Sequence, residues 1–241
     1  MWFQNLRDDI KAAKLNDPAA RNSFEIWLTY AGVHALSWHR VAYFFHVKMK
    51  LKLIARIISQ VTRFFTGVEI HPAAKIEGGV FIDHGSGVVI GETAEVHRGT
   101  VIYQGVTLGG TGKERGKRHP TIMENVTLSA GAKVLGGFTV GKGAKIGAGA
   151  VVLKEVPPYA TVVGIPGRIV RIRTPETEEQ THSGIIAVAA LNAEINAEEA
   201  ERREEEAKKA AREAEEKRSK KKPSKKKEEK VEKGETDNEN L

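Results

Sequence analysis

An aliphatic residue returns every sixth position through most of residues 70–163, and no other feature of the sequence restricts the fold as strongly. The residues that mark this pattern are Ile70, Ile76, Ile82, Ile90, Val96, Ile102, Leu108, Ile122, Leu128, Val134, Val140, Ile146 and Val152. The interval differs from the period of about 3.6 residues of an α-helix and from the period of about 2 of a surface strand. It is typical of a parallel β-helix of hexapeptide repeats, in which three repeats form one triangular coil and the aliphatic residues point inward.

The six-residue step is interrupted twice, once at Val88-Val89 and once over residues 109–121. A stack of such coils buries one narrow core, and each coil contacts chiefly its neighbours. A deep pocket within the stack is therefore not expected. We expect chemistry where the repeat is interrupted, or in a cleft between subunits.

The sequence predicts three parts: a helical N-terminal domain over 1–66, a parallel β-helix domain over 67–173, and a charged tail over 174–241. In the first part, Asp17 followed by Pro18 is typical of a helix start. Apolar residues recur at helical spacing over 24–46 and 51–65. The tail is rich in Glu, Lys, Arg and Ala without an apolar face, which predicts a partly helical, largely disordered segment.

Composition excludes several classes of function. The 241 residues contain no cysteine, which excludes disulfides, cysteine-ligated metals and a thiol nucleophile. The first nine residues have no basic region followed by an apolar core, so no export signal is predicted. Charged residues interrupt the apolar stretch over 24–65, so we expect no membrane span and a cytoplasmic protein.

The positive charge is concentrated before the tail. Residues 176–241 carry 15 Lys and Arg against 19 Asp and Glu, and the whole chain has a net charge of +7, so the first 175 residues carry +11. A basic body is compatible with a polyanionic ligand, including nucleic acid, and equally with an ordinary solvated surface.

Four histidines lie in or beside the repeats, and two of them stand at the interruptions. His84 follows Asp83 just before the first interruption, and His119 follows Arg118 at the end of the second. Glu69 precedes His84 by fifteen residues, one coil less three, so the two could share one side of adjacent coils. A carboxylate on one imidazole nitrogen would leave the other free as a general base, which typically contributes about 10²- to 10⁴-fold in rate. Alternatively, Glu69 is a solvent-exposed residue of the first coil.

Several motifs together resemble one enzyme family. They are Glu69-Ile-His-Pro-Ala-Ala-Lys-Ile76, Asp83-His84-Gly, Gly91-Glu-Thr-Ala94, Gln104-Gly-Val-Thr-Leu-Gly-Gly-Thr-Gly-Lys113, Arg118-His119-Pro120 and Gly164-Ile-Pro-Gly167. This combination, over residues 17–173, resembles the serine O-acetyltransferases. These hexapeptide-repeat enzymes transfer the acetyl group of acetyl-CoA to L-serine in the first step of cysteine synthesis.

The resemblance implies a role for each matching residue. His84 would be the general base that takes the proton of the serine hydroxyl during direct attack on the thioester, with no acyl-enzyme. Glu69 stands where the family has an orienting Asp, one methylene shorter. Asp17 and Asp83 would hold the serine ammonium. Arg118 and His119 would hold its carboxylate, which also places His119 in the catalytic centre.

The resemblance also implies a binding site for acetyl-CoA, the co-substrate, and no metal. Gly109, Gly110 and Thr111 would offer backbone N–H groups to the developing oxyanion. Coenzyme A would lie along the solenoid near Gly110, Thr111, Ala130, Lys145 and Ala148. Binding of its phosphates would use the positive charge of the body, so nucleic acid is not expected as a partner.

Assembly is inferred from the same resemblance. Family members coil with the left hand and form trimers with active sites between subunits, often paired into dimers of trimers through the helical part. The short helical part here favours a trimer. In the family a terminal Ile docks into O-acetylserine sulfhydrylase; this chain departs from that pattern with Leu241, and docking of its C-terminal residues into the same enzyme is a hypothesis.

Three other functions are compatible with parts of the sequence. A hexapeptide acetyltransferase for a sugar or antibiotic hydroxyl would keep His84 and the CoA residues without needing both charged pairs. A zinc-dependent γ-carbonic anhydrase would use three imidazoles between subunits, but residues 109–113 would then have no purpose. A scaffold with a nucleic-acid-binding tail would show salt-sensitive DNA binding and no thioester turnover.

Overall fold

The structure is a computed structural model that describes residues 2–112 and 115–173, together with Lys208. Apart from Lys208, these residues belong to one compact unit, Met1–Asn192. The expectations for the charged tail and for Leu241 lie outside the described residues.

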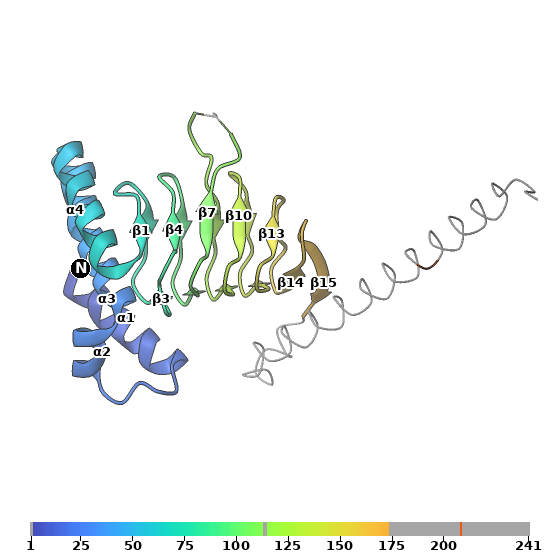
Figure 1. The fold of residues 1–241 in the computed structure, drawn as a ribbon, viewed down its shortest axis with the longest axis horizontal. Coiled ribbons are helices and arrows are strands. Elements are labelled where there is room, and N and C mark those ends of the chain that lie inside the picture. Colours follow the sequence, from blue (N-terminus) through green and yellow to red (C-terminus); the bar gives the residue numbers. More distant parts are fainter. Residues whose placement is uncertain (1, 113–114, 174–207, 209–241) are drawn as a thin grey trace, which may run out of the picture. The chain divides into compact units, whose positions relative to one another are not determined.

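Helices form the N-terminal part, at the end of the solenoid where the first strand lies (Figure 1). They are α1 (Trp2–Asn16), α2 (Ser23–Thr29), α3 (Ala31–Tyr43), the short π-helix η1 (Phe44–Lys48) and α4 (Lys52–Thr66). The Asn22 side chain caps α2 by accepting a hydrogen bond of 2.9 Å from the Glu25 N–H. Gly67 ends α4 in the left-handed conformation (φ 71°), which glycine adopts without steric cost.

The predicted helix start at Asp17 is wrong. Helix α1 ends at Asn16, and the next helix begins only at Ser23. The Asp17 N–H donates to the Ala13 carbonyl (2.9 Å), and its Oδ1 accepts the Ala19 N–H (2.8 Å). Because its side chain bonds to the turn after α1, Asp17 closes a helix instead of opening one. The helical spacing over 24–46 is also divided, since Tyr30 has an extended conformation between α2 and α3.

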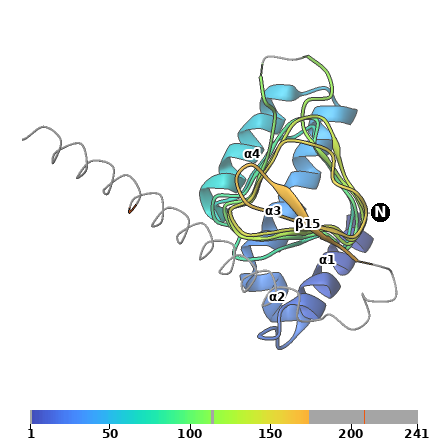
Figure 2. The same ribbon diagram turned by 90° about the vertical axis from the view of Figure 1, so that its right-hand side faces the viewer.

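Three parallel sheets form the faces of a triangular prism (Figure 2). Sheet 1 contains β1 (Glu69–Ile70), β4 (Val89–Ile90), β7 (Thr107–Gly109), β10 (Lys133–Leu135) and β13 (Val151–Val152). Sheet 2 contains β2 (Lys75–Ile76), β5 (Glu95–Val96), β8 (Thr121–Ile122) and β11 (Thr139–Val140). Sheet 3 contains β3 (Phe81–Ile82), β6 (Val101–Ile102), β9 (Thr127–Leu128), β12 (Lys145–Ile146), β14 (Ala160–Val163) and the antiparallel β15 (Arg168–Ile172).

The chain passes from sheet 1 to sheet 2, then to sheet 3, and back to sheet 1. We call the turn from sheet 1 to sheet 2 the first corner, the turn from sheet 2 to sheet 3 the second corner, and the turn from sheet 3 to sheet 1 the third corner. From β1 to β13, the turns between the short strands therefore lie at one of three edges, whereas the segment from β13 to β14 and the hairpin of β14 and β15 end the stack.

The core consists of the aliphatic residues that keep the six-residue step. All of them are buried except Ile76, which is partly exposed. A second inward position lies two residues earlier in most repeats and holds smaller side chains: Ala74, Val80, Val88, Ala94, Val106, Val126, Ala132, Ala144 and Ala150. Alternation of a large and a small side chain fills the narrow prism without voids.

Helix α3 rests directly on β3 because Gly32 has no side chain. A Cβ atom at Gly32 would lie 2.1 Å from the Ile82 carbonyl oxygen. A buried ion pair also joins α3 to α1, since Arg40 Nη1 of α3 lies 2.6 Å from Asp9 Oδ2 of α1. Asp9 Oδ1 also accepts the Gly79 N–H at the second corner (2.9 Å). Burial raises the pKa of Asp9, and Arg40 opposes this rise.

No helix among the described residues combines the length and the apolar character that crossing a bilayer requires.

We predict that Gly32→Ala lowers the free energy of unfolding by about 1–3 kcal/mol, because the added methyl overlaps the backbone of β3. Urea denaturation would measure the change. Gly112→Ala is the matched control, since nothing lies within 4 Å of the position of its Cβ. Equal stability of the two variants would contradict the close contact between α3 and β3.

Candidate active site

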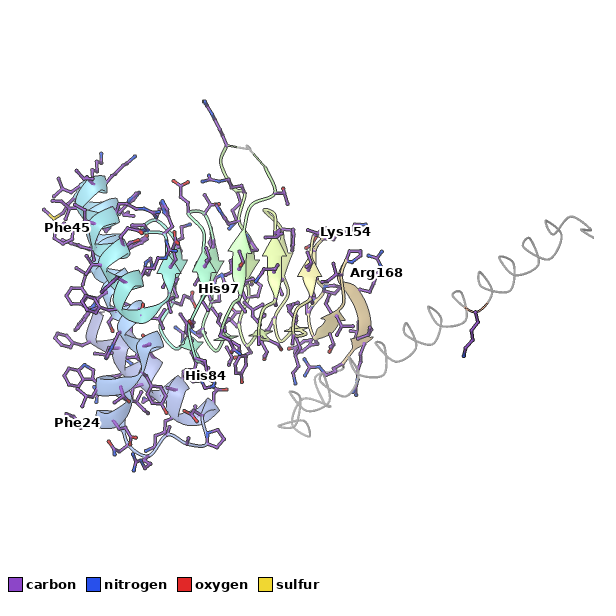
Figure 3. The ribbon with its side chains drawn as sticks, viewed as in Figure 1. Phe24, Phe45, His84, His97, Lys154 and Arg168 are labelled. Carbon is purple, nitrogen blue, oxygen red and sulfur yellow. The ribbon has the colours of Figure 1, made fainter. Side chains whose placement is uncertain are left out.

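His84 stands at the third corner, in the turn between β3 and β4. This step between aliphatic residues, Ile82 to Ile90, is eight positions long instead of six, so the turn has two extra residues. His84 adopts a positive φ of 54°, and 74% of its side chain is exposed. Figure 3 shows it on the lower side of the view, away from the long excursion above. The insertion therefore pushes one imidazole out of the prism.

Two carboxylates and a tyrosine gather beside His84. His84 Nε2 lies 3.7 Å from Asp83 Oδ2. The Tyr30 hydroxyl donates a hydrogen bond of 2.5 Å to Asp17 Oδ2. Burial, followed by the charge of Asp17, raises the pKa of Asp83, and the charge of His84 opposes the rise. The structure thus brings Asp17, Asp83 and His84 to one corner.

The second interruption lies at the first corner, between β7 and β8; of its residues beyond the strands the structure describes 110–112 and 115–120, and Thr93 holds the part that returns to β8. The Thr93 hydroxyl accepts the backbone N–H groups of Arg118 and His119, both at 3.1 Å. His119 Nδ1 accepts the Thr93 N–H (3.2 Å) and lies 2.9 Å from the Thr93 hydroxyl. Lys117 Nζ donates to the Thr93 carbonyl (2.8 Å).

These contacts define the protonation of His119. Because Nδ1 accepts a backbone N–H, the proton of the neutral ring lies on Nε2. Burial, followed by the charge of Arg118, lowers the pKa of His119, which favours this neutral form. The ring packs on Gly91, where a Cβ atom would lie 2.0 Å from His119 Cδ2. His119 is therefore a fixed donor at Nε2.

Arg118 forms an ion pair in the free chain. Its Nη2 donates to Glu92 Oε2 at 2.5 Å, and this bond is the main cause of the lowered pKa of Glu92. His71 lies near the pair, and its ring stands edge-on to that of His46 at 5.7 Å. At the first corner the Glu92 carboxylate is therefore paired with Arg118, and the charges of His71 and His119 also lower its pKa.

Glu69 contacts arginines of α4 and not His84. Arg63 Nη1 lies 3.0 Å from Glu69 Oε2, and Arg56 Nη2 lies 3.5 Å from Glu69 Oε1. Within the described residues, no hydrogen bond joins Glu69 to His84. The expected pair is thus not formed in the single chain.

The residues predicted to hold coenzyme A divide between two corners. Gly109 ends β7, and Gly110 packs against Arg118 at the first corner. Ala130 and Ala148 occupy the third corner on successive coils, joined by the hydrogen bond from the Gly149 N–H to the Ala130 carbonyl (2.9 Å).

The third corner continues the same edge as His84. Left-handed glycines stack along it, and the bonds from the Gly87 N–H to Gly67, from Gly105 to Ser86 and from Gly131 to Gln104 repeat down the edge at 2.8–3.0 Å. Lys145 begins β12 on the adjoining sheet 3. The third corner therefore presents a narrow edge of small residues that runs from His84 to Ala148.

A single chain does not unite the predicted site. Asp17, Asp83 and His84 lie at the third corner, whereas Arg118 and His119 lie at the first. His97 occupies the second corner, where its Nδ1 lies 3.2 Å from Glu77 Oε1. Within the described residues, no three His, Asp or Glu side chains are grouped as they would be around a metal ion.

Three residues of these clusters were missed as functional residues in the sequence. Glu92 and Thr93 lie in the Gly91–Ala94 motif, which identified a family without assigning them a role. Nothing in the sequence indicated a functional role for Tyr30, because it fits the pattern of apolar positions expected in a helix.

Comparison with known proteins defines the class of this site. Residues 119–154 match the family described as bacterial transferase hexapeptide, six repeats. The predicted fold, a left-handed parallel β-helix after a helical part, is confirmed by the likeness to solved structures of that class. The molecule is a hexapeptide-repeat transferase.

The particular family follows from individual relatives. A serine acetyltransferase of Bacillus pumilus is 63% identical over 170 residues, which are 70% of this chain and 78% of the relative. The crystal structure of serine acetyltransferase from Vibrio cholerae matches with a TM-score of 0.70 and 46% identity over 72% of this chain and 67% of that one. The chain belongs to the serine acetyltransferase family, as its motifs predicted.

Two further structures contain ligands. Serine acetyltransferase from Brucella abortus in complex with coenzyme A has a TM-score of 0.69 and 43% identity, covering 72% of this chain and 69% of that one. The Neisseria gonorrhoeae enzyme in complex with serine has a TM-score of 0.68 and 39% identity, covering 70% of this chain and 69% of that one.

We predict that Thr93→Val lowers the free energy of unfolding by about 1–3 kcal/mol, because it removes an acceptor for two backbone N–H groups and a partner of the imidazole. Thr93→Ser keeps the hydroxyl and is the matched control. Urea unfolding followed by circular dichroism measures both. If Ser and Val were equally destabilising, the methyl group and not the hydroxyl would hold the loop.

Proposed function

We propose that the protein transfers the acetyl group of acetyl-CoA directly to the hydroxyl of L-serine, giving O-acetyl-L-serine and CoA. Membership of the serine acetyltransferase family supports this reaction. The observation that carries it is the separation of charge between two corners. Carboxylates surround the exposed His84, and a cation with a fixed N–H donor lies at Arg118 and His119.

Serine is a small zwitterion, and these two groups are complementary to its two ends. In this proposal Asp17 and Asp83 hold the ammonium, and Arg118 and His119 Nε2–H hold the carboxylate. Opposite charges at both ends fix the hydroxyl beside the base, and such orientation contributes several kcal/mol to catalysis. A sugar acceptor has neither charge and would use neither group.

The complete site is proposed to lie between two copies of the chain. The two groups occupy different corners of one prism, so the third corner of one subunit has to meet the first corner of the next. A closed ring of three such contacts gives a homotrimer. Pairing of two trimers through the helical part belongs to the same proposal.

His84 is the proposed general base. Its imidazole takes the hydroxyl proton of serine while the serine oxygen forms a bond to the thioester carbonyl carbon. The resulting oxyanion collapses and the carbon–sulfur bond breaks. The CoA thiolate then takes from the imidazolium the proton that came from serine. No acyl-enzyme forms, which agrees with a chain that contains no cysteine.

Glu69 is proposed to orient the His84 imidazole, as the family's aspartate would. Its ion pairs with Arg56 and Arg63 are partly exposed, so each contributes at most about 1 kcal/mol. Replacing an arginine by the His84 imidazole as the partner of Glu69 therefore costs little free energy.

Acetyl-CoA is the proposed co-substrate. The backbone N–H groups of Gly109, Gly110 and Thr111 are suited to the oxyanion at the first corner, and donors of this kind contribute about 2.7–4 kcal/mol to other enzymes. Ala130 and Ala148 are suited to a close approach of the pantetheine arm along the third corner, with Lys145 for a phosphate. The division of these residues between two corners supports binding of CoA between subunits.

Cysteine biosynthesis as the pathway and the cytoplasm as the location belong to the same proposal. So does a contact between the C-terminal residues ending in Leu241 and O-acetylserine sulfhydrylase.

We predict that His84→Ala lowers kcat by about 10²- to 10⁴-fold, because the serine hydroxyl loses its base. Release of CoA with L-serine and acetyl-CoA measures the rate. His97→Ala is the matched control at the second corner and should retain at least half of the parent rate. A loss below tenfold for His84→Ala would remove this residue from the mechanism.

A second prediction tests the shared site. His84→Ala subunits and Arg118→Ala subunits should each be nearly inactive, yet co-refolded mixtures should recover about a quarter of the parent activity per site. The reason is that one site in four combines an intact third corner with an intact first corner. No recovery in verified mixed oligomers would mean that each site lies within one subunit.

A further inference from the structure

We propose that Tyr30 is a positioning residue for the ammonium end of the substrate, because its hydroxyl holds the Asp17 carboxylate beside Asp83 and His84. This inference rests on the proposed function and assigns to Tyr30 a part in selecting acceptors that carry a primary ammonium next to the reacting hydroxyl.

The backbone of Tyr30 is held firmly between two helices. Its N–H donates to the Ile26 carbonyl at the end of α2 (3.1 Å), and its carbonyl accepts the N–H groups of Val33 and His34 at the start of α3 (3.1 and 3.2 Å). Gly32, two residues later, lies against the Ile82 carbonyl of β3. Because β3 leads directly into Asp83 and His84, the position of Tyr30 is fixed relative to the base.

The aromatic ring of Tyr30 is also packed. It contacts a buried cluster that includes Ala13 of α1, Val33 of α3 and Phe81 of β3. Packing against this cluster restricts the ring and therefore the hydroxyl at its tip.

The Tyr30 hydroxyl adds a second hydrogen bond to the Asp17 carboxylate. Oδ1 accepts the Ala19 N–H at 2.8 Å, and Oδ2 accepts the Tyr30 O–H at 2.5 Å. Each carboxylate oxygen still has a lone pair for another donor. The carboxylate is therefore immobilised without being saturated, as an ammonium site requires.

Electrostatics at this corner favours a cationic ligand. The hydrogen bond to Asp17 is the main cause that raises the pKa of Tyr30 to about 12, and the charges of Asp17 and Asp83 both contribute. The same two charges raise the pKa of Tyr103, after burial. Tyr30 thus stays a donor at neutral pH, while two nearby carboxylates, one of them partly desolvated, repel each other until a cation binds.

The test is steady-state kinetics of Tyr30→Phe in the full-length protein. We expect the KM for L-serine to rise about tenfold, as for loss of a hydrogen bond to a charged group, while kcat at saturating serine and the KM for acetyl-CoA stay within twofold. Tyr43→Phe at the end of α3 is the matched control and should leave all three values within twofold, since the Tyr43 ring packs edge-on to His39, away from Asp17.

Three outcomes would overturn the proposal. An unchanged KM for serine would mean that Asp17 does not need the hydroxyl. A parallel rise in both KM values, or a fall in melting temperature of more than about 5 °C, would mean that the hydroxyl acts on the fold. Failure of the proposed function itself is recognised separately, because the parent protein would then release no CoA with L-serine.

Discussion

Every coil of the prism has to fill the same narrow core, and this packing constraint governs what the rest of the chain can do. The inward positions alternate a large aliphatic residue with a small one, as Val80 with Ile82 and Ala94 with Val96. A polar side chain at either position costs about 1–3 kcal/mol unless it finds a hydrogen-bond partner, as the buried Thr100 does at the Met123 carbonyl (3.3 Å). Extra residues can therefore enter only at corners, and the two insertions enter at different ones. The separation of His84 from His119 follows from the architecture.

In the free chain, the first-corner half of the proposed site balances its own charge through the Arg118–Glu92 ion pair. Glu92 forms an ion pair with the Arg118 guanidinium. The side chain of Glu92 is 39% exposed and that of Arg118 is 29% exposed. A pair this accessible to water contributes about 0–1 kcal/mol, so the carboxylate of a substrate can replace Glu92 at low cost. The third corner differs, because within the part of the chain that the structure describes neither Asp17 nor Asp83 forms an ion pair with an arginine or a lysine. Burial raises the pKa of Asp83, and an arriving ammonium relieves this unfavourable charge.

The sequence predicted the prism, because a period of six residues has no other common explanation, and its two interruptions mark the corners at which His84 and His119 lie. It failed where side chains meet across distant segments. Asp17 was taken for a helix cap, since an Asp before a Pro is typical of one, but its side chain bonds to Ala19 and Tyr30. The contact of Tyr30 with Asp17 could not be predicted, because an aromatic residue in a helical pattern indicates only burial. Glu69 was expected beside His84 from a separation of fifteen residues, and spacing along coils cannot report two arginines brought in by α4.

Glu69 illustrates how assembly can decide between two roles for one carboxylate. No acidic residue occurs between Glu25 and Glu69, whereas that interval contains Arg56 and Arg63, so Glu69 is the first carboxylate that these α4 arginines reach. In the single chain the pairs are half exposed and screened by water. A second subunit packed over the third corner would exclude that water, and every charge pair kept there would strengthen as the effective dielectric constant falls. Under the proposed assembly, an imidazole that becomes charged during the reaction would gain most from such a partner, so burial at the subunit contact would decide whether Glu69 pairs with the arginines of α4 or with His84.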